Sequence, residues 1–341
     1  MARAKSVKLS DIAEQAGVSA ATVSNALSGN KGVSESIRTK IAGIAEQMGY
    51  QAKAKHAAHE NKVFNIGVVI AERFLGRETS FYWTLYHELT QAAQRATCII
   101  MFEVLSSDNE KNHVMPLFAR EDQVDGVIIL GQLDKQYIES MKRDISLPML
   151  CLDFYLEDMH MDSVISENFY GMYQMTNYLI DRGHRKIFFV GTVLSNCSIT
   201  DRYFGYKKAL LENGIHEEES WVIPDRDMQS GTIDVKLPDD MPTAYVCNCD
   251  LTACDVVMAL QDKGFRVPED ISVVGFDNFC YERYRDVDIT TYEVNIKRMA
   301  KMSIERISHR IRHNELRPTK ESLQIAMGHM IVKSSVQAIE V

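Results

Sequence analysis

The chain has 341 residues, of which 45% are hydrophobic and 25% are charged, and it contains seven cysteines. This composition is typical of a globular protein of about two domains, and it excludes intrinsic disorder, a disulfide-stabilised scaffold and, because no apolar run reaches ~18 residues, a membrane-spanning helix. The net charge of −9 divides into +4 on residues 1–62 and −13 on residues 63–341, which indicates a polyanionic partner for the first part and a different partner for the second.

The first ten residues are basic and contain no apolar segment, so they do not resemble a secretory signal, and we expect a cytoplasmic protein with reduced thiols. Three short helices are predicted next: Ser10 caps the first, Ser19 the second (20 to about 27) and Ser34 the third. Gly17 suits the left-handed position after the first helix. The residues predicted to face inward are Ile12, Ala13, Ala16, Val23, Leu27, Ile37, Ile41, Ile44 and Met48.

The first two helices, joined by Gly17-Val18-Ser19, have the spacing of a helix-turn-helix. The second helix exposes small and polar side chains, and such a face suits the major groove of DNA because it lets the helix backbone approach the base edges. From spacing alone, a structural three-helix bundle that binds no DNA remains the alternative reading.

The ordered segments Asp-Ile-Ala, Gly-Val-Ser, Ala-Thr-Val-Ser, Val-Ser-Glu and Gly-Tyr lie between residues 11 and 50. With them, this part of the chain resembles the DNA-binding head of the lactose-repressor (LacI/GalR) family. The resemblance implies that the head binds double-stranded operator DNA. The DNA-binding residues that we predict are Ser19, Ala20, Ala21, Thr22, Ser24, Asn25, Asn30, Lys31, Lys53, Lys55 and His59.

Two positions depart from the family pattern. Asn25 stands where the family commonly has Arg, and because Asn pairs with adenine whereas Arg pairs with guanine, we expect Asn25 to read an adenine or to read its base weakly. In the segment 51–62, Ala52 replaces the usual Pro, and His59 replaces an apolar side chain that would wedge into the minor groove. The segment is basic and rich in Ala, so a helix along the phosphates and a solvated linker are both open, while His56 and His59 alone are a weak metal signal.

From residue 63 onward, short apolar runs alternate with amphipathic segments, which predicts parallel doubly wound sheets, and about 280 residues suggest two of them. Ligands of such folds bind at the carboxyl ends of the strands, in the cleft between two lobes. The predicted strands are 63–71, 97–104, 124–130, 148–153, 186–191, 244–247 and 271–276. The predicted helices are 82–95, 109–119, 135–143, 169–182, 202–213, 251–263 and 296–313.

The family resemblance continues in this part, through Asn168 with Gly171, the segments 183–187, 201–206 and 267–277, and Asp250. It implies a two-lobed core like the periplasmic binding proteins, below an all-α head. The domains that we predict are a helix-turn-helix domain (1–50), a hinge or linker (51–62) and an effector-binding and dimerisation core (63–341). Lobe 1 is expected over about 63–160 and 289–321, and lobe 2 over about 161–288 and 322–341.

A sugar-like effector needs forked donors, acceptors and an aromatic face. Candidates at the ends of strands or in loops are Phe81, Asp153, Arg202 and Asp277, and the resemblance places effector contacts at these four positions. Each also has a structural reading, as a core aromatic ring, a helix-end ion pair or a turn residue. Asn248 is added because the family's usual Asn-Asp is replaced here by Cys249-Asp250, so Asn248 can supply the missing amide.

The rim of this cleft is also expected to be unusual, because the family's helical segment is shortened to a loop over 225–241. Cys247, Cys249 and Cys254 match no standard zinc spacing and are read as small buried residues instead of metal ligands. No metal and no cofactor are expected, and the sequence contains no P-loop, dinucleotide-binding, nucleophile-elbow or zinc-protease motif.

These observations predict a DNA-binding transcriptional regulator, most simply a repressor. It is expected to bind a near-palindromic operator as a homodimer and to be controlled by a small sugar or sugar-phosphate effector. The same regulator with a phosphosugar or protein co-repressor is the alternative. A sugar-processing enzyme or a solute-binding module on the same core is the further rival, and specific operator binding distinguishes the regulator from both.

Overall fold

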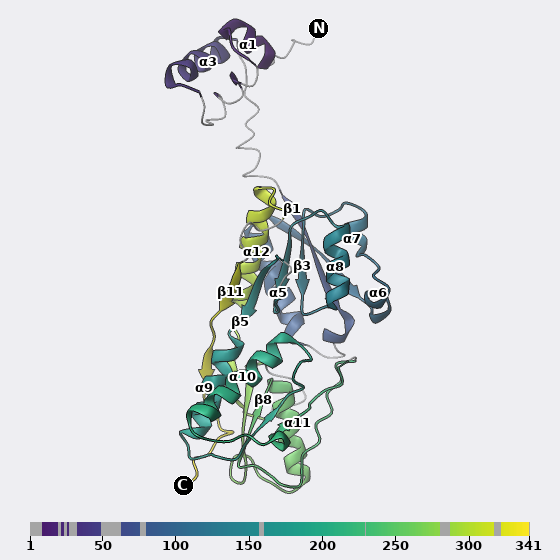
Figure 1. Cartoon of the computed structure of the whole chain (residues 1–341), viewed down its shortest axis with the longest axis vertical. Helices are drawn as coiled ribbons and strands as arrows, with labels where there is room; N and C mark the ends of the chain where they lie inside the picture. The colour runs from purple at the N-terminus through teal and green to yellow at the C-terminus, as the bar shows by residue number, and fades with distance from the viewer. Residues whose placement is uncertain are drawn as a thin grey trace. The chain divides into compact units, whose positions relative to one another are not determined.

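The computed structural model describes residues 9–19, 22–23, 26, 33–48, 63–75, 80–156, 160–228, 230–279, 287–316 and 322–340. The chain divides into two compact units, Met1–Lys62 and Val63–Val341 (Figure 1). The predicted fold class is confirmed, with a helical head and a core that contains two separate sheets.

The head contains α1 (Leu9–Ala16) and α3 (Glu35–Gln47). As predicted, Gly17 has a positive φ of 73° after α1, and the Ser19 hydroxyl accepts the N–H of Thr22 at 3.1 Å. The small core consists of Ile12, Ala13, Ala16, Val23, Ala26, Ile41 and Ala45.

Two expectations for the head were wrong. Ser10 does not cap α1, because the helix already begins at Leu9. Ile37 is 38% exposed instead of buried, since it lies in the first turn of α3, one turn before the first fully buried position, Ile41. The predicted core residue Leu27 lies outside the described residues.

The first sheet of the core is entirely parallel. Three neighbouring strands, Phe64–Ala71, Gly126–Leu130 and Met149–Leu152, are apolar almost throughout, as expected for a sheet covered by helices on both sides. All five residues of Gly126–Leu130 are buried. In spatial order the strands are β11 (Leu323–Ala326), β5 (Asp162–Ser166), β4 (Met149–Leu152), β3 (Gly126–Leu130), β1 (Phe64–Ala71) and β2 (Cys98–Leu105).

The second sheet is parallel except for its edge strand β12, which runs antiparallel to β10. In spatial order its strands are β12 (His329–Ile331), β10 (Thr290–Glu293), β9 (Ser272–Asp277), β8 (Ala244–Cys247), β6 (Ile187–Val190) and β7 (Val222–Ile223).

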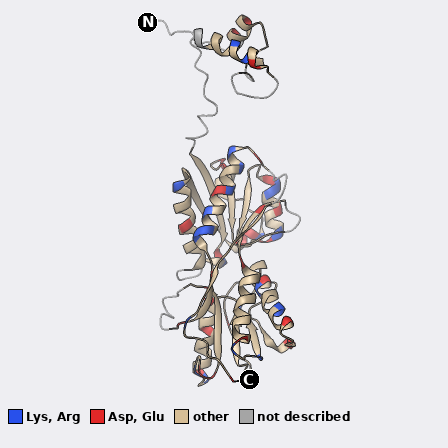
Figure 2. Cartoon of the chain, turned by 90° about the vertical axis from the view of Figure 1, so that its left-hand side faces the viewer, with Lys and Arg blue, Asp and Glu red and all other residues tan. Residues whose placement is uncertain are grey.

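Helices cover the sheets and carry most of the charged side chains, whereas the strands are nearly free of them (Figure 2). The first lobe has η1 (Glu72–Phe74), α5 (Phe81–Arg95), α6 (Ser107–Lys111), α7 (Leu117–Arg120), α8 (Lys135–Asp144) and α12 (Ile296–Arg312). The second has α9 (Asn168–Ile180), α10 (Cys197–Glu212), η2 (Glu219–Trp221) and α11 (Asp250–Asp262).

The chain passes between the two sheets three times: after β5, between β10 and α12, and between β11 and β12. The lobe boundaries of the sequence analysis are therefore corrected. β5 and β11 belong to the first sheet and not to lobe 2, and β10 belongs to the second sheet and not to lobe 1. The reason is physical: each of these short strands pairs with a strand of the sheet that the chain is about to leave, β5 with β4, β10 with β9 and β11 with β5, before the chain crosses.

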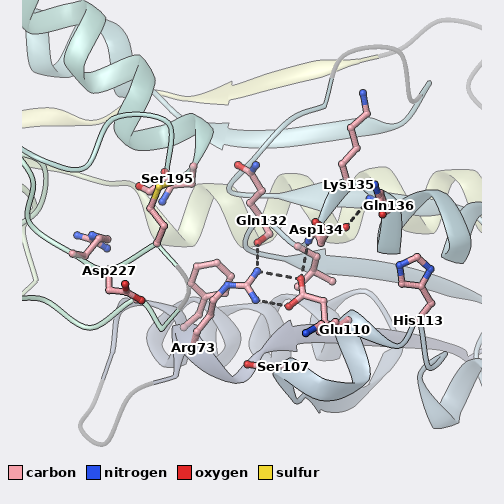
Figure 3. A pocket seen from close by; sticks show the side chains of 17 residues that line it. Arg73, Ser107, Glu110, His113, Gln132, Asp134, Lys135, Gln136, Ser195 and Asp227 are labelled. Carbon is pink, nitrogen blue, oxygen red and sulfur yellow. Dashed lines mark hydrogen bonds and ion pairs between the residues drawn. The ribbon is translucent and has the colours of Figure 1, made fainter.

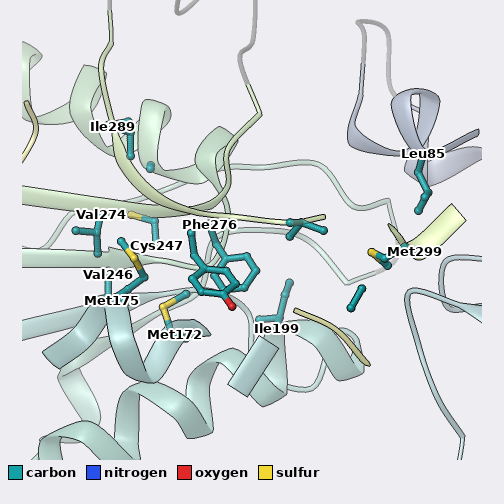
Figure 4. Close-up of a cluster of buried hydrophobic side chains, with 14 of the residues drawn as sticks. Leu85, Met172, Met175, Ile199, Val246, Cys247, Val274, Phe276, Ile289 and Met299 are labelled. Carbon is teal, nitrogen blue, oxygen red and sulfur yellow. The ribbon is translucent and has the colours of Figure 1, made fainter. Parts of the chain in front are cut away.

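One continuous hydrophobic core includes residues of both lobes. Leu85 and Met299 come from helices of the first lobe, whereas Met172 and Phe276 come from the second (Figure 4). The lobes are thus packed through apolar side chains as well as joined by three chain segments.

Candidate functional site

Of the predicted DNA-binding residues, the structure describes Ser19 and Thr22, whose hydroxyl groups are 2.8 Å apart at the start of the second helix. This places the turn of the helix-turn-helix where the sequence predicts it. The other predicted DNA-binding residues lie outside the described residues: Ala20, Ala21, Ser24, Asn25, Asn30, Lys31, Lys53, Lys55 and His59.

The predicted effector residues lie at carboxyl ends of strands and in the helices that follow. Phe81 begins α5, which is capped by Ser80, and its ring contacts that of Tyr82 edge to face at 5.4 Å. Asp153 follows β4 and Asp277 ends β9, each with a positive φ. Such a backbone is uncommon outside glycine and marks positions that the surrounding structure constrains.

Asp153 is at least nine-tenths buried, and one of its two carboxylate oxygens is satisfied. The hydroxyl of Tyr82 donates to Oδ2 at 2.9 Å, whereas Oδ1 has no hydrogen-bond partner among the described residues. Burial raises the pKa of Asp153 to about 6, against the opposing charge of Arg202. The carboxyl group is therefore poised to exchange hydrogen bonds with a ligand.

Arg202 lies in the second turn of α10. The expectation that it opens the helix was wrong, because α10 begins at Cys197, where the Asn196 side chain caps it. Arg202 Nε donates to Asn168 Oδ1 at 2.9 Å, and Nη1 donates to the carbonyl oxygen of Asn248 at 2.7 Å.

The guanidinium of Arg202 also lies over the ring of Phe276, 4.0 Å from its centre. Its partner Asn168 is 2% exposed, and Nδ2 of that side chain has no hydrogen-bond partner among the described residues. The Arg202 cluster thus presents a buried donor, Asn168 Nδ2, in addition to the buried acceptor Asp153 Oδ1.

Asp277 pairs with a second carboxyl group, that of Asp250. The backbone N–H of Phe279 donates to both, at 2.9 Å and 3.0 Å, and the Thr291 hydroxyl donates to Asp250 at 2.8 Å. Burial, followed by the charge of Asp250, raises the pKa of Asp277 well above its usual range.

Asn248 has a different environment from the one expected. Its Nδ2 donates to Val190 O (3.0 Å) and Asp225 Oδ2 (2.7 Å), and its Oδ1 accepts from Arg226 (3.0 Å). The amide thus already has partners at both ends. Arg226 Nη2 also lies 3.6 Å from the sulfur of Cys249. A guanidinium group thus contacts the residue that stands in place of the family's usual Asn.

A cavity of about 620 Å³ lies between the two lobes of the core (Figure 3). None of the five predicted effector residues lines it. Its walls come from the segments after β1, β2 and β3 in the first lobe and after β6 and β7 in the second. Among its lining residues are Arg73, Glu110, Gln132, Ser195 and Arg226.

The shortened loop over 225–241 forms one wall of this cavity. It folds back on itself through a bridge between Arg226 and Ile233, with Gly231 at a positive φ of 71°. The sequence analysis singled out this loop as a rim of the cleft, but it gave no role to Asp225 or Arg226. Tyr82, Asn168 and Asp250 were not among the predicted effector contacts, although Asn168 and Asp250 had been noted as family positions.

The described residues contain no three His, Cys, Asp or Glu side chains grouped so that they could hold a metal ion. A search of the same part of the chain finds no helix long and apolar enough to cross a membrane.

Two family models match the chain. Residues 8–53 match the model of bacterial regulatory proteins of the lacI family, and residues 176–336 match that of a periplasmic binding protein-like domain. The first match includes α1 and α3 of the head, and the second includes most of the second lobe together with α12.

Among curated proteins, the transcriptional repressor PurR of Aliivibrio salmonicida is 27% identical over 318 residues, which cover 91% of this chain and 94% of the relative. The ribose operon repressor of Haemophilus influenzae is 26% identical over 310 residues, which cover 89% and 92%.

Among solved structures, the complex of the transcriptional regulator CelR with cellobiose has a TM-score of 0.67 at 21% identity, covering 96% of this chain and 99% of that one. The lac repressor dimer bound to operator and the anti-inducer ONPF has a TM-score of 0.64 at 22% identity, covering 98% and 100%. At these identities the likeness establishes the fold.

Proposed function

This chain belongs to the lacI family of bacterial regulatory proteins and is a DNA-binding transcriptional regulator, and from that premise we propose how it works. It represses transcription by binding a near-palindromic operator as a homodimer. A small sugar-like effector binds between the lobes of the core and changes the affinity for the operator. The relatives named as repressors support this assignment along nine-tenths of the chain.

The observation that carries the effector proposal is the pair of unsatisfied atoms beside Arg202. Asp153 Oδ1 and Asn168 Nδ2 are buried and have no partner among the described residues. Buried polar atoms are nearly always hydrogen-bonded, and leaving one unpaired costs about 1–3 kcal/mol. Hydroxyl groups both donate and accept, so the hydroxyls of a sugar have the chemistry that both atoms lack. We keep Phe81, Arg202 and Asp277 as proposed effector contacts. Asn248 is proposed to act indirectly, through its hydrogen bonds with Arg202 and Arg226.

The dimer is proposed to form through the first lobe, as the sequence predicts. Strand β2 is the edge of the first sheet, and large apolar side chains are exposed along it: Val104 is 43% exposed on the face toward α5, where Trp83 is 38% exposed, and Ile99 is 54% exposed on the opposite face of the strand. The rings of Trp83 and Phe102 lie 5.6 Å apart. An exposed apolar edge of this kind is a surface that a second copy covers.

No cofactor and no catalytic activity are part of the proposal, and the compartment proposed is the cytoplasm, where operator DNA lies. The relatives are repressors, and none of the residues gathered around Arg202 forms a nucleophile with an adjacent base. Effector action then depends only on a difference in effector affinity between the operator-bound and free conformations.

The experiment is operator selection from random DNA with the full chain, followed by mobility-shift titration with and without a panel of sugars and sugar phosphates. We expect a two-fold symmetric site and a ligand that releases it. Absence of any preferred sequence would exclude the regulator. A ligand that strengthens binding would replace induction by co-repression.

Asn25 provides a sharper test at base level. We expect one half-site position to prefer adenine, because an Asn side chain pairs with adenine N6 and N7, and we expect Asn25→Ala to lose about 1–3 kcal/mol of discrimination there. Binding to operators substituted at one base measures this. A guanine preference that disappears in Asn25→Ala contradicts it.

A further inference from the structure

The cavity between the lobes has its own chemistry, separate from the Arg202 cluster. Its charged lining residues are Arg73, Lys111, Lys135 and Arg226 against Glu110, Asp134 and Asp227. A nearly balanced set of charges says little by itself. What matters is which of these groups already have partners within the protein and which face the cavity unused.

The acidic groups are committed to the protein. Glu110 accepts both terminal nitrogens of Arg73 and, at 2.7 Å, the backbone N–H of Asp134. Asp134 caps α8 by accepting the N–H groups of Gln136 and Tyr137 at 2.8 and 3.2 Å. Both oxygens of Glu110 and Oδ1 of Asp134 are thus engaged within the protein, and Glu110 neutralises the guanidinium of Arg73 where it lies (Figure 3).

Asp227 is committed in the same way. Its Oδ1 accepts the N–H and the hydroxyl of Ser230, at 2.7 and 2.9 Å, and so holds the turn of the shortened loop. Glu110, together with one oxygen each of Asp134 and Asp227, thus holds the walls of the cavity in place.

The Arg226 guanidinium is hydrogen-bonded to the protein through Nε and Nη2 but not, among the described residues, through Nη1. Its Nε and Nη2 donate to the buried carboxylate of Asp225 at 3.0 and 2.6 Å, and Nη2 also donates to Asn248. The described residues offer Nη1 no hydrogen-bond partner, and the side chain is 20% exposed where it lines the cavity. Asp225 therefore fixes the fork in orientation and leaves two N–H groups for a ligand.

Two further donors face the cavity from other elements. The Ser195 hydroxyl oxygen is buried without a partner among the described residues. Gln132 Oε1 accepts the N–H of Cys197 at 2.9 Å, which turns the Gln132 amide nitrogen the other way. Ser195 precedes α10 in the second lobe and Gln132 follows β3 in the first, so the two line the cavity from opposite lobes (Figure 3).

The start of α10 adds to this field. Ser195 and Asn196 lie directly before the first turn of that 16-residue helix and line the cavity. A helix N-terminus carries a partial positive charge that favours anions. Together with the unpaired Ser195 hydroxyl and the free N–H groups of Arg226, whose charge Asp225 balances, it gives this corner of the cavity hydrogen-bond donors for the oxygens of a ligand.

We propose that this cavity binds the phosphoryl group of a phosphorylated small sugar, held by Arg226 Nη1, the Ser195 hydroxyl and the Gln132 amide. Three donors from three elements match three peripheral oxygens, whereas a carboxylate has only two. This inference rests on the proposed function, because it names the class of effector. It also accounts for Cys249 in place of the family's usual Asn, because the guanidinium of Arg226 lies against the Cys249 sulfur and supplies a hydrogen-bond donor there.

The test is calorimetric titration of the full chain, without DNA, with matched pairs: ribose and ribose 5-phosphate, glucose and glucose 6-phosphate, fructose and fructose 1-phosphate. Inorganic phosphate and gluconate serve as probes of the phosphoryl and carboxylate groups alone. We expect at least one phosphate ester to bind tenfold or more tightly than its parent sugar, and inorganic phosphate to compete with it.

Arg226→Gln is expected to remove this preference, and Ser195→Ala to weaken phosphate-ester binding several-fold. Because Arg226→Gln leaves Asp225 buried without its partner and can unfold the lobe, Ser195→Ala is the decisive second variant. The matched control is Arg266→Gln, which changes a guanidinium that is 69% exposed on the same lobe and is expected to bind like the wild type.

Parent sugars that bind as tightly as their esters in every pair overturn the proposal, as does a preference for gluconate or one that survives in both variants. A mobility-shift assay on the same preparations separates the two hypotheses. Failure of the wild type to bind any operator overturns the regulator function, while the phosphoryl site is judged by calorimetry alone.

Discussion

The ionisation of Asp153 links ligand binding to the stability of the folded protein. Its pKa is about 6 in the folded state and 3.8 when the group is exposed, because burial outweighs the attraction of Arg202. A raised carboxyl pKa means that ionisation is unfavourable in the fold. The penalty is absent below pH 4, grows between pH 4 and 6, and is complete above pH 6.

We therefore predict that Asp153→Asn stabilises the protein at neutral pH. The amide removes the buried charge and still accepts the hydrogen bond of Tyr82, so the free energy of unfolding rises by up to about 3 kcal/mol at pH 7.5. The gain should shrink toward zero at pH 4. Urea unfolding at several pH values measures it, with the exposed Asp239→Asn as control.

The same variant is expected to bind effector less well, because an amide offers one acceptor oxygen where the carboxylate offers two. A variant that is less stable than the wild type at pH 7.5, or a gain that is the same at pH 4 and 7.5, would contradict this account of Asp153. The first result would mean that the Asp153 carboxylate stabilises the fold, and neither result fits a fold that tolerates an unfavourable buried charge for the sake of ligand binding.

At the scale of elements, apolar runs identified the strands that are buried on both faces. The predicted strand 244–247 matches β8, and most of the other six differ by one or two residues at each end. Five strands were missed: β7 and β12 have only two and three residues, and β5, β10 and β11 mix apolar and polar residues, as in Asp162–Ser166. Their polar groups are satisfied by partners far away in sequence, which no local pattern shows.

The predicted helix over 109–119 is instead two short helices, α6 and α7. The chain is interrupted by His113 at a positive φ of 54° and by Pro116, which precedes α7. Proline at a helix start was readable from the sequence, whereas the left-handed turn at a non-glycine residue was not.

A glycine sets the distance between α9 and α10. A Cβ added at Gly205 would lie 2.1 Å from the carbonyl oxygen of Phe169, so the two helices approach too closely for any side chain there. We predict that Gly205→Ala destabilises the core by about 1–3 kcal/mol through overpacking. The measurement is the calorimetric unfolding of the core.

Gly43→Ala is the matched control, because nothing lies within 4 Å of its added Cβ in α3. It should stabilise the head by about 0.5–1 kcal/mol through helix propensity. Two alanine substitutions in helices thus have opposite signs. Equal effects would show that propensity, and not the contact with Phe169, governs position 205.

Helix α12 is fixed to the first sheet by a buried ion cluster. Asp162 in β5 accepts from Arg306 Nε and Nη2 at 2.7 and 2.9 Å and from Arg310 Nε at 2.7 Å. The two guanidinium groups hold the pKa of Asp162 below its usual value although burial opposes them. The charge is therefore stabilising at every pH above about 4.

We predict that Asp162→Asn destabilises the core by about 3 kcal/mol, because it leaves buried guanidinium charge without its partner. The loss should be constant between pH 5 and 8, in contrast to the pH-dependent effect at Asp153, and it should decline only as the pH falls below 4. Urea midpoints across this range test it. A loss of less than 0.5 kcal/mol would mean that Glu315 suffices for Arg310.

At the scale of the whole molecule, the proposed dimer depends on the exposed edge strand β2. We predict that Ile99→Glu converts the dimer to monomers and lowers operator affinity, because each dimer would bury two carboxylates in an apolar interface. Sedimentation equilibrium measures it. Leu211→Glu on α10, at a side chain that is 73% exposed on the second lobe, is the control and should leave the dimer intact.

The site was only partly accessible from the sequence. Phe81, Asp153, Arg202 and Asp277 were predicted because the carboxyl ends of parallel strands meet at one edge of a sheet and because the family resemblance points to them, and their contact with an effector stays a prediction. Arg226 was missed because its position depends on the fold of a shortened loop, and on a buried aspartate next to it that no periodicity reveals. The contact between Arg226 and Cys249 arises from the tertiary structure, so the sequence alone did not predict it.

The three connections between the lobes all lie far from the phosphoryl cavity, so a rotation of one lobe about them moves the cavity walls more than the connections themselves. All of them leave from one edge of the sheets, at β11 and β5 and at β12 and β10, whereas the cavity lies beyond β1, β3 and β6 toward the opposite edge. Four strand spacings of ~4.8 Å make a lever of about 20 Å. On that lever, a rotation of about 10° moves the cavity walls by about 3 Å while the crossing segments hardly shift. Contacts made by a ligand in this cavity therefore change most when the lobes rotate, whereas contacts made beside the crossing segments change least.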